Sequence, residues 1–259
     1  SKADTSTLSP PESRSGSIFA RIAKREAPAH LTLPHRPLFH PRMETLLLAS
    51  SSPRRKDILS SLEIPFVAVH PDIDESIFDH EEPGRRTISL ALAKAAAGAA
   101  IHSSLGTAGG TGSAGPEIRL VLGADTLVAL PEKDGWLVLG KPENRKEAGE
   151  MTAYLAGKTH RVFTGIALVA LDSGASWVAL SDSAVSFSPM SAREIDEYLD
   201  TGDWEGAAGG YKLQGRASFH ISRIDGSWSG VMGLPICELY DILMRANFRL
   251  SPSIRLGRI

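Results

Sequence analysis

The sequence predicts an α/β protein with a mixed sheet and a cleft between two lobes. Short apolar runs typical of buried strands alternate with segments of helical periodicity. These strands do not follow a strict strand–helix–strand repeat, and tight turns such as residues 133–135 join some of them directly. A chain of 259 residues, 42% of them hydrophobic, is long enough to bury such a core.

The first expected elements are a strand, a tight loop and a helix. Residues 44–49, which end in the apolar run 46–49, predict a short buried strand, and Ser52 and Pro53 then resemble the N-cap and first position of a helix. A second strand is expected at residues 66–69 and a second helix at about 87–101.

The second half of the chain predicts more hairpins and helices. The expected elements are a strand at 120–122 that ends at 123–126, a hairpin of 127–130 with 136–139, a helix after Asn144, strands at 161–171 and 177–187, a helix at 191–200, and a terminal hairpin and helix. Four glycines within residues 206–215 predict a backbone that bends tightly or approaches a ligand.

Three stretches are expected to lie outside the packed core. Residues 1–43 are rich in Ser, Pro, Arg and His and predict a disordered N-terminal tail. Residues 102–117 are rich in Gly, Ser and Thr and predict a flexible insertion. With residues 251–259 as a C-terminal tail, the folded domain is expected to span residues 44–250.

Composition restricts the class of protein. The formal net charge of −2 provides no overall field toward nucleic acid, and no apolar run reaches the roughly 20 residues of a membrane helix. No secretory signal is recognisable. The N-terminal segment contains acidic residues, which argue against a mitochondrial transit peptide. We therefore expect a soluble cytoplasmic protein with no membrane or nucleic-acid partner, and we expect the single cysteine, Cys237, to be buried.

Three cations occupy an unusual position at a helix start. Arg54, Arg55 and Lys56 fall in the first helical turn, where the free amides and the helix dipole favour negative charge. A bound polyphosphate between these side chains and the preceding serines, Ser50 among them, would remove the penalty. A solvated helix start with exposed charges is an equally good interpretation of the motif alone.

Carboxylates and two further lysines form the second candidate cluster. Asp125 is expected at the end of a strand, and Glu75 follows another, so the two could hold Mg²⁺ together. Lys94 and Lys141 could each reach a phosphate oxygen. Taken singly, each has an ordinary alternative: a turn residue for Asp125, a solvated loop for Glu75, and a solvent-facing lysine on a helix flank for Lys94.

Four motifs in order resemble the Maf family of nucleotide pyrophosphatases. They are Leu-Ala-Ser-Ser-Ser-Pro-Arg-Arg at 48–55, Leu-Gly-Ala-Asp-Thr at 122–126, Gly-Lys-Pro at 140–142 and Ala-Gly-Gly-Tyr-Lys-Leu-Gln-Gly at 208–215. The resemblance extends from about Thr45 to Phe248. It implies a two-lobed mixed-sheet fold like that of inosine triphosphate pyrophosphatases, with a central cleft, a catalytic domain at 44–250 and a homodimer.

The resemblance also implies roles for individual residues. Asp125 would be the proton acceptor and a metal ligand, Glu75 a second metal ligand, and Lys141 a catalytic cation. The groups around the substrate would be Ser50, Arg54, Arg55, Lys94, Thr126 and Gln214. Mg²⁺ would be the metal, with Mn²⁺ or Co²⁺ able to replace it.

Arg54, Thr126 and Gln214 match the branch of the family that acts on dTTP and UTP. An amide such as Gln214 can donate to and accept from a pyrimidine edge. One departure is Ala207, where the family often has a lysine; Lys212 could replace it.

The resulting hypothesis is hydrolysis of dTTP, UTP or modified pyrimidine nucleotides to the monophosphate and pyrophosphate. A nucleotide-binding regulator of cell division and septum formation, without significant turnover, is the alternative. A nucleic-acid-binding protein is the weakest interpretation, because no aromatic stacking platform accompanies the basic residues.

Overall fold

The computed structural model describes residues 44–79, 82–108 and 118–250. The strands are β1 Thr45–Ala49, β2 Phe66–Val69, β3 Ile118–Glu132, β4 Gly135–Leu139, β5 Thr159–Ala170, β6 Ser176–Phe187 and β7 Ile221–Asp225. The α-helices are α1 Pro53–Ser61, α2 Pro83–Ala108, α3 Arg145–Leu155, α4 Ala192–Leu199, α5 Trp228–Met232 and α6 Ile236–Arg245. Three 3₁₀ turns, η2 Glu75–Phe78, η3 Ala208–Gly210 and η4 Arg216–His220, complete the described elements.

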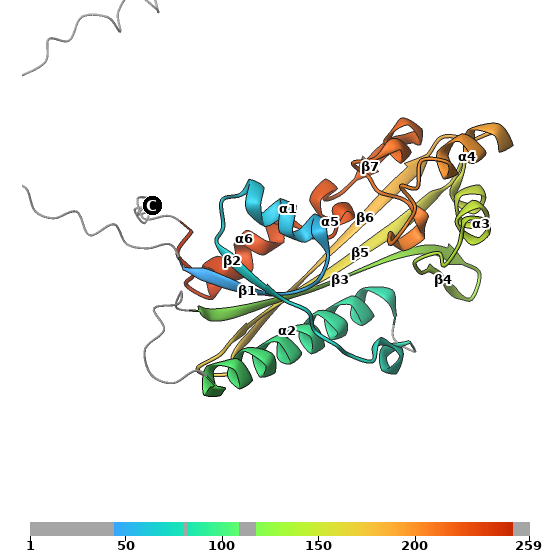
Figure 1. Ribbon diagram of the computed structural model, residues 1–259. Coiled ribbons are helices and arrows are strands. Elements are labelled where there is room, and N and C mark those ends of the chain that lie inside the picture. Colours follow the sequence, from blue (N-terminus) through green and yellow to red (C-terminus); the bar gives the residue numbers. More distant parts are fainter. Residues whose placement is uncertain (1–43, 80–81, 109–117, 251–259) are drawn as a thin grey trace, which may run out of the picture. The chain divides into compact units, whose positions relative to one another are not determined.

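The strands form one mixed sheet, as the sequence predicts. Their order is β2-β1-β3-β5-β6-β7, and β4 pairs with the last part of β3. β1 is parallel to β2 and β3, whereas β3, β5, β6 and β7 pair antiparallel in succession. The α/β class and the mixed sheet are therefore confirmed (Figure 1).

β3 changes partner along its length, and this change creates the floor of the candidate site. One of its sides pairs with β1 as far as Gly123 and with β4 from Val128 onward. Between them, residues 124–127 have no strand partner on that side in the described part of the chain, while β5 continues the ladder on the other side. A break in pairing opposite an intact ladder leaves room for a ligand.

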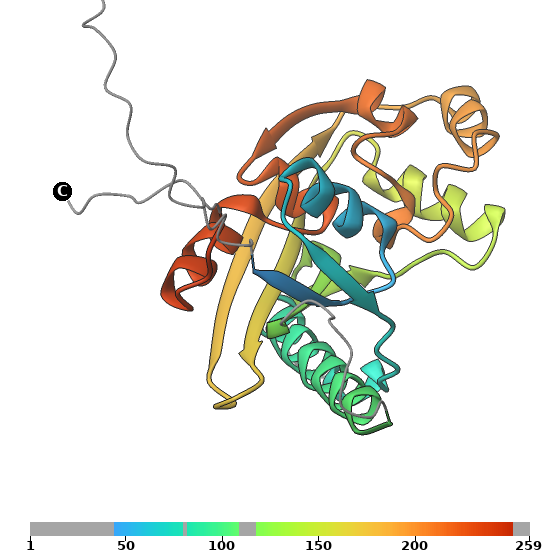
Figure 2. The same ribbon diagram turned by 60° about the vertical axis from the view of Figure 1, so that its left-hand side comes forward.

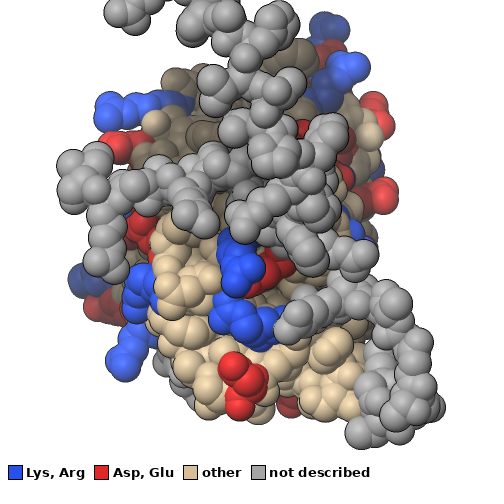
Figure 3. Space-filling model, turned by 90° about the vertical axis from the view of Figure 1, so that its left-hand side faces the viewer, with Lys and Arg blue, Asp and Glu red and all other residues tan. Residues whose placement is uncertain are grey.

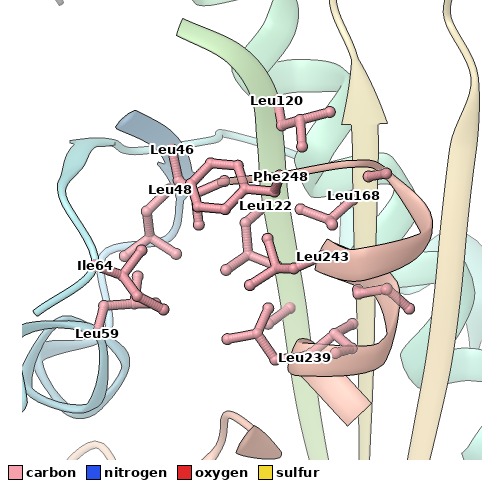
Figure 4. Close-up of a cluster of buried hydrophobic side chains, with 14 of the residues drawn as sticks. Leu46, Leu48, Leu59, Ile64, Leu120, Leu122, Leu168, Leu239, Leu243 and Phe248 are labelled. Carbon is pink, nitrogen blue, oxygen red and sulfur yellow. The ribbon is translucent and has the colours of Figure 1, made fainter. Parts of the chain in front are cut away.

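Helices cover both faces of the sheet where β1 and β3 meet (Figures 1 and 2). Leu46 and Leu48 pack with α1 and α6 on one face, where Figure 4 shows their cluster. Leu47 and Ala49 pack with the α2 residue Ala95 on the other. Burial on both faces explains why β1 is an uninterrupted apolar run.

A second hydrophobic cluster forms the other lobe. It joins the far ends of β3, β5 and β6 to α3 and α4, with members such as Val128, Leu155, Phe187 and Leu199. The first cluster draws on the near ends of β3 and β5. The two-lobed arrangement expected from the sequence is thus present, with the same strands running through both lobes.

Two strand glycines let α2 lie directly against the sheet. A Cβ on Gly123 would fall 2.0 Å from the carbonyl oxygen of Ala91, and a Cβ on Gly165 would fall 2.4 Å from the carbonyl carbon of Thr87. Gly165 pairs with Asp125 across β3 and β5. The helix backbone therefore reaches the sheet beside Asp125, which only glycine permits.

Some predicted boundaries were wrong. α2 continues through residues 102–108, so this part of the expected flexible insertion is helical; residues 109–117 and both predicted tails lie outside the described residues. β3 does not end at Asp125 but passes through it. The expected terminal hairpin is absent from the described residues, where the one strand after residue 215, β7, pairs with β6, and Cys237 is exposed rather than buried.

The described helices and one face of the surface bear on what the composition predicts. None of the described helices is both long and apolar enough to cross a bilayer. On the uncovered part of the face in Figure 3, basic and acidic side chains lie side by side. That mixture agrees with the formal charge of −2.

Candidate active site

All nine residues singled out by the sequence line one cleft. The cleft has a volume of about 650 Å³ and is open to solvent. These residues are Ser50, Arg54, Arg55, Glu75, Lys94, Asp125, Thr126, Lys141 and Gln214. They come from segments up to 164 residues apart in the chain, so the fold brings together what the motifs only list in order.

Asp125 lies at the floor of the cleft, in the unpaired stretch of β3. It is 6% exposed, and its Oδ1 accepts a hydrogen bond of 2.6 Å from the Lys94 ammonium. Its other oxygen, Oδ2, is buried without a hydrogen-bond partner in the described structure. A buried carboxylate oxygen that lacks a partner is costly, so a ligand that satisfies it would bind favourably.

Lys94 joins the two carboxylates. It projects from α2, its side chain is 12% exposed, and its Nζ lies 2.6 Å from Asp125 and 2.7 Å from Glu75. The close approach of α2 at Gly123 and Gly165 places this helix within reach of β3. One nearly buried ammonium thus forms ion pairs with both acidic groups.

Glu75 is the more accessible carboxylate. It begins η2, and its side chain is 51% exposed. Partial burial raises its pKa, but the hydrogen bond and charge of Lys94 and the charges of Lys141 and Arg86 outweigh this effect and leave the pKa below its ordinary value. Glu75 is therefore ionised at neutral pH.

The acidic residue beside Glu75 does not join the site. Asp74 is exposed and accepts hydrogen bonds from the backbone and hydroxyl of Ser76, which caps η2 and lowers the pKa of Asp74. Of these two neighbouring carboxylates, only Glu75 lines the cleft.

Arg55 is bound to the protein itself. Its guanidinium donates to the Gly233 carbonyl at 2.8 Å, to Ser50 Oγ at 3.0 Å and to Thr126 Oγ1 at 3.2 Å. Burial lowers its pKa, and the charge of Asp125 partly offsets this effect. Arg55 thereby ties α1 to β3 and to the residue that follows α5.

The contact between Arg55 and Thr126 extends into β5. The Thr164 hydroxyl is buried and lies 3.0 Å from Thr126 Oγ1 and 2.8 Å from the carbonyl oxygen of Gly230. This polar chain links α1, β3, β5 and α5 through Thr126, the residue that follows Asp125. Hydrogen bonds of this kind restrain the elements that they join.

Arg54 and Lys141 are two of the cations that line the cleft. Neither is held in an ion pair within the described part of the chain. Arg54 is half-buried, and burial lowers its pKa; Lys141 is exposed but close enough to act on Glu75. An anion in the cleft would be attracted by both.

Gln214 lies on the opposite, glycine-rich side. Its side chain is exposed, and the backbone before it has positive φ at Gly206, Gly209 and Gly210. Gly209 donates to the Gly140 carbonyl at 2.8 Å, which joins this segment to the turn that carries Lys141. The glycines expected to bend the chain here do so.

Tyr211 anchors this segment to the second lobe. It is buried, with 7% of its surface exposed; its hydroxyl lies 2.7 Å from His160 Nε2, and burial raises the pKa of the phenol. Burial also lowers the pKa of His160 to about 4. The segment 206–215 is therefore anchored by the uncharged pair of Tyr211 and His160.

Sequence reasoning missed several cleft residues. His70, Arg86 and Glu205 also line the cleft. Arg86 lies among ordinary charged residues at a helix start, and no motif separates it from its neighbour Arg85. Ala207 is fully buried and does not line the cleft, whereas Lys212 does.

The site can accept a divalent cation only with help from a ligand. The described residues contain no group of three or more His, Cys, Asp or Glu side chains arranged to hold a metal. Asp125, with its unpartnered Oδ2, and Glu75 supply two oxygen ligands of the kind that Mg²⁺ prefers. Substrate oxygens and water would have to complete the coordination.

A mixed α/β sheet, a carboxylate pair and a ring of cations define an enzyme-like cleft for a phosphorylated ligand. Comparison with known sequences then gives the family. The chain matches the family described as Maf-like protein over residues 45–246. The chain belongs to the Maf family.

Relatives with assigned activities cover almost the same residues. A dTTP/UTP pyrophosphatase of Treponema denticola is 40% identical over 213 residues, which is 80% of this chain and 100% of that protein. Proteins of the same name from Moorella thermoacetica and Alkalilimnicola ehrlichii are each 39% identical, over 78% and 76% of this chain and 94% and 91% of their own lengths.

Proposed function

We propose that this protein hydrolyses dTTP and UTP, and modified pyrimidine nucleotides of the same shape, to the monophosphate and pyrophosphate. The observation that carries the proposal is the Lys94–Asp125–Glu75 cluster: Asp125, with one buried oxygen that has no hydrogen-bond partner in the described structure, lines the same cleft as several cations. Family membership and the names of the relatives support the same reaction.

Each charged residue has a role in this proposal. Asp125 orients the attacking water and accepts its proton. Arg54 and Lys141 bind the phosphates and stabilise the charge on departing pyrophosphate, while Lys94 exchanges its carboxylate contacts for a phosphate oxygen. Ser50 and Arg55 shape the adjoining wall of the triphosphate site.

A divalent cation fits Asp125 and Glu75, with Mg²⁺ first and Mn²⁺ or Co²⁺ as replacements. When bound, it would neutralise phosphate charge. Glu75 is suited to this role because its lowered pKa keeps it ionised. Thr126 and Gln214 line the cleft with groups that can donate and accept, as pyrimidine recognition requires.

The proposal includes a homodimer and a cytoplasmic location. Light scattering of the purified chain, and fractionation of cells that express it, would test these two points separately. Neither is needed for the chemistry, because all nine proposed residues belong to one chain.

The decisive test is incubation with Mg²⁺ and a panel of nucleoside triphosphates, with pyrophosphate resolved from orthophosphate. We expect pyrophosphate with UMP or dTMP, and loss of release when EDTA removes the metal. Nucleotide binding without release of either product would instead favour a regulator. The proposed reaction requires attack of water at the α-phosphorus. Orthophosphate as the product would show attack at the γ-phosphorus instead and contradict the proposal.

A further inference from the structure

A second cation of α2 holds the segment that carries Glu75. Arg86 lies at the start of α2, and its guanidinium forms an ion pair with Asp79, the residue that caps the end of η2. The Arg86 side chain is 17% exposed and that of Asp79 is 50% exposed. Neither residue was singled out by the sequence, and neither touches Asp125 in the described contacts.

Two ion pairs join η2 to α2, and they connect the two segments in an antiparallel order. Glu75 pairs with Lys94. Asp79, four residues after Glu75, pairs with Arg86, which lies eight residues before Lys94. Eight helical residues span about 12 Å and return to the same stripe of an α-helix. η2 is therefore tied to one stripe of α2 at both of its ends.

η2 needs such ties because it has almost no apolar anchorage. It is a four-residue 3₁₀ turn without a buried residue, and Ile77 within it is 68% exposed. The Asp74 cap stabilises the turn internally but does not attach it to α2. Its position on the protein is thus left mainly to polar contacts.

The two ties differ in what happens to them when substrate binds. Lys94 is shared with Asp125, so a phosphate or a cation in the cleft competes for its contact with Glu75. Arg86 also lines the cleft, but its partner Asp79 does not, and their ion pair shares no residue with the Lys94 cluster. It can keep Glu75 in place while Lys94 changes partner.

We propose that Arg86 and Asp79 are positioning residues, which hold η2 on α2 so that Glu75 keeps its place beside Asp125 during turnover. This inference rests on the proposed role of Glu75 in holding the divalent cation. It predicts that the pair acts on metal affinity through Glu75, without touching the reacting atoms.

The test compares Arg86→Gln and Asp79→Asn, singly and together, with Arg85→Gln as the matched control. Arg85 is the adjacent, exposed arginine on the same helix, and its side chain has no ion pair in the described residues. Calorimetric titration of Mn²⁺ with α,β-imido-UTP present measures metal affinity without turnover. The Mg²⁺ dependence of pyrophosphate release provides the kinetic counterpart.

Loss of an outer partner of a metal ligand weakens metal binding by roughly 10–100-fold, and we expect the lower end, about 10-fold, because Glu75 is half exposed. Both single variants should show this loss of metal affinity. The double variant should bind the metal no more weakly than either single variant, because the two residues act as one pair. Arg86→Lys should recover part of the affinity, and Arg85→Gln should equal the wild type. The UTP KM at saturating Mg²⁺ should stay unchanged.

Three outcomes separate the possible failures. If Glu75→Gln weakens Mn²⁺ binding but the Arg86 and Asp79 variants stay within twofold of wild type, the positioning inference is wrong. If Arg86→Gln raises the UTP KM while Asp79→Asn has no effect, Arg86 contacts the triphosphate directly, which also overturns it. If Glu75→Gln changes nothing, the proposed role of Glu75 fails first. Circular dichroism of every variant verifies folding.

Discussion

The two sides of the cleft are built in opposite ways. Asp125 and Lys94 lie on a 15-residue strand and a 26-residue helix, and both side chains are nearly buried. Gln214 is exposed and lies in a segment without strands, after three glycines with positive φ. The chemical centre is thus carried by regular structure, and the proposed base-recognition residue by a loop.

The difference matches what each side has to do in the proposed reaction. Proton transfer and metal binding demand groups held to within about 0.5 Å, which packed elements provide. A base edge can be recognised by a loop on a rigid support, and here Tyr211 and His160 supply that support. Variation of the loop can therefore change substrate preference without rebuilding the centre.

The largest effect is expected at the floor of the cleft. Asp125→Asn keeps the size of the side chain but removes the proton acceptor, so pyrophosphate release should fall by about 10³-fold, within the range for general acid–base groups. Steady-state assays would measure it, with Asp134→Asn in the exposed β3–β4 turn as control. More than a tenth of wild-type activity would remove Asp125 from its role.

The next effect concerns the packing that brings Lys94 to Asp125. Gly165→Ala places a methyl group against the backbone of Thr87, which cannot move aside as a side chain can. Overpacking costs typically 1–3 kcal/mol, and we expect about 3 kcal/mol of lost unfolding free energy. Urea denaturation would show it. Gly140→Ala, with open space around its Cβ, should be near neutral; equal losses would contradict this account of the helix contact.

The support of the loop should respond to acid. His160 has a pKa of about 4 in the folded state against 6.5 in the reference state, so the unfolded chain binds the extra proton first. The free energy of unfolding should therefore decrease as pH falls through 6.5 toward 4, by up to about 3 kcal/mol from this residue, and level off below pH 4.

His160→Gln keeps a polar group beside Tyr211 without the titration. Its stability relative to wild type should improve between pH 7 and pH 4, as measured by denaturant unfolding at each pH. A constant difference across this interval would show that His160 is not the group responsible.

The smallest effect is expected at the loop itself. Gln214→Ala should reduce the ratio of kcat/KM for UTP over GTP about 10-fold, the equivalent of one hydrogen bond of about 1.4 kcal/mol. The melting temperature should not change, because the side chain is exposed. An unaltered UTP-to-GTP ratio would reject the assignment of base recognition to Gln214.

The motifs located the candidate residues well but not the structure around them. The strand at 120–122 was predicted to end at 123–126, whereas β3 continues through these residues and Gly123 admits the backbone of α2 beside it. The length of α2 was underestimated because Gly and Ser in residues 102–108 are poor helix formers in isolation. Tertiary packing overrides such local preferences.

Contacts between distant segments were beyond prediction from the motifs. The motif did not predict that Arg55 would bond to residues at positions 50, 126 and 233. The pair of Arg86 with Asp79 likewise depends on how η2 lies against α2. Local patterns carry the type and order of residues. They do not carry the register between elements that meet only after folding.

The continuous β3 strand also limits how the cleft can move. β3 runs through both lobes and pairs with β5 over residues 120–129. A hinge rotation between the lobes would therefore have to break the hydrogen bonds between these two strands. Entry of nucleotide and departure of products must therefore be accommodated at the rim, by loop 206–215 and η2. In amide hydrogen exchange, β3 and β5 should exchange together and last, while the rim exchanges early.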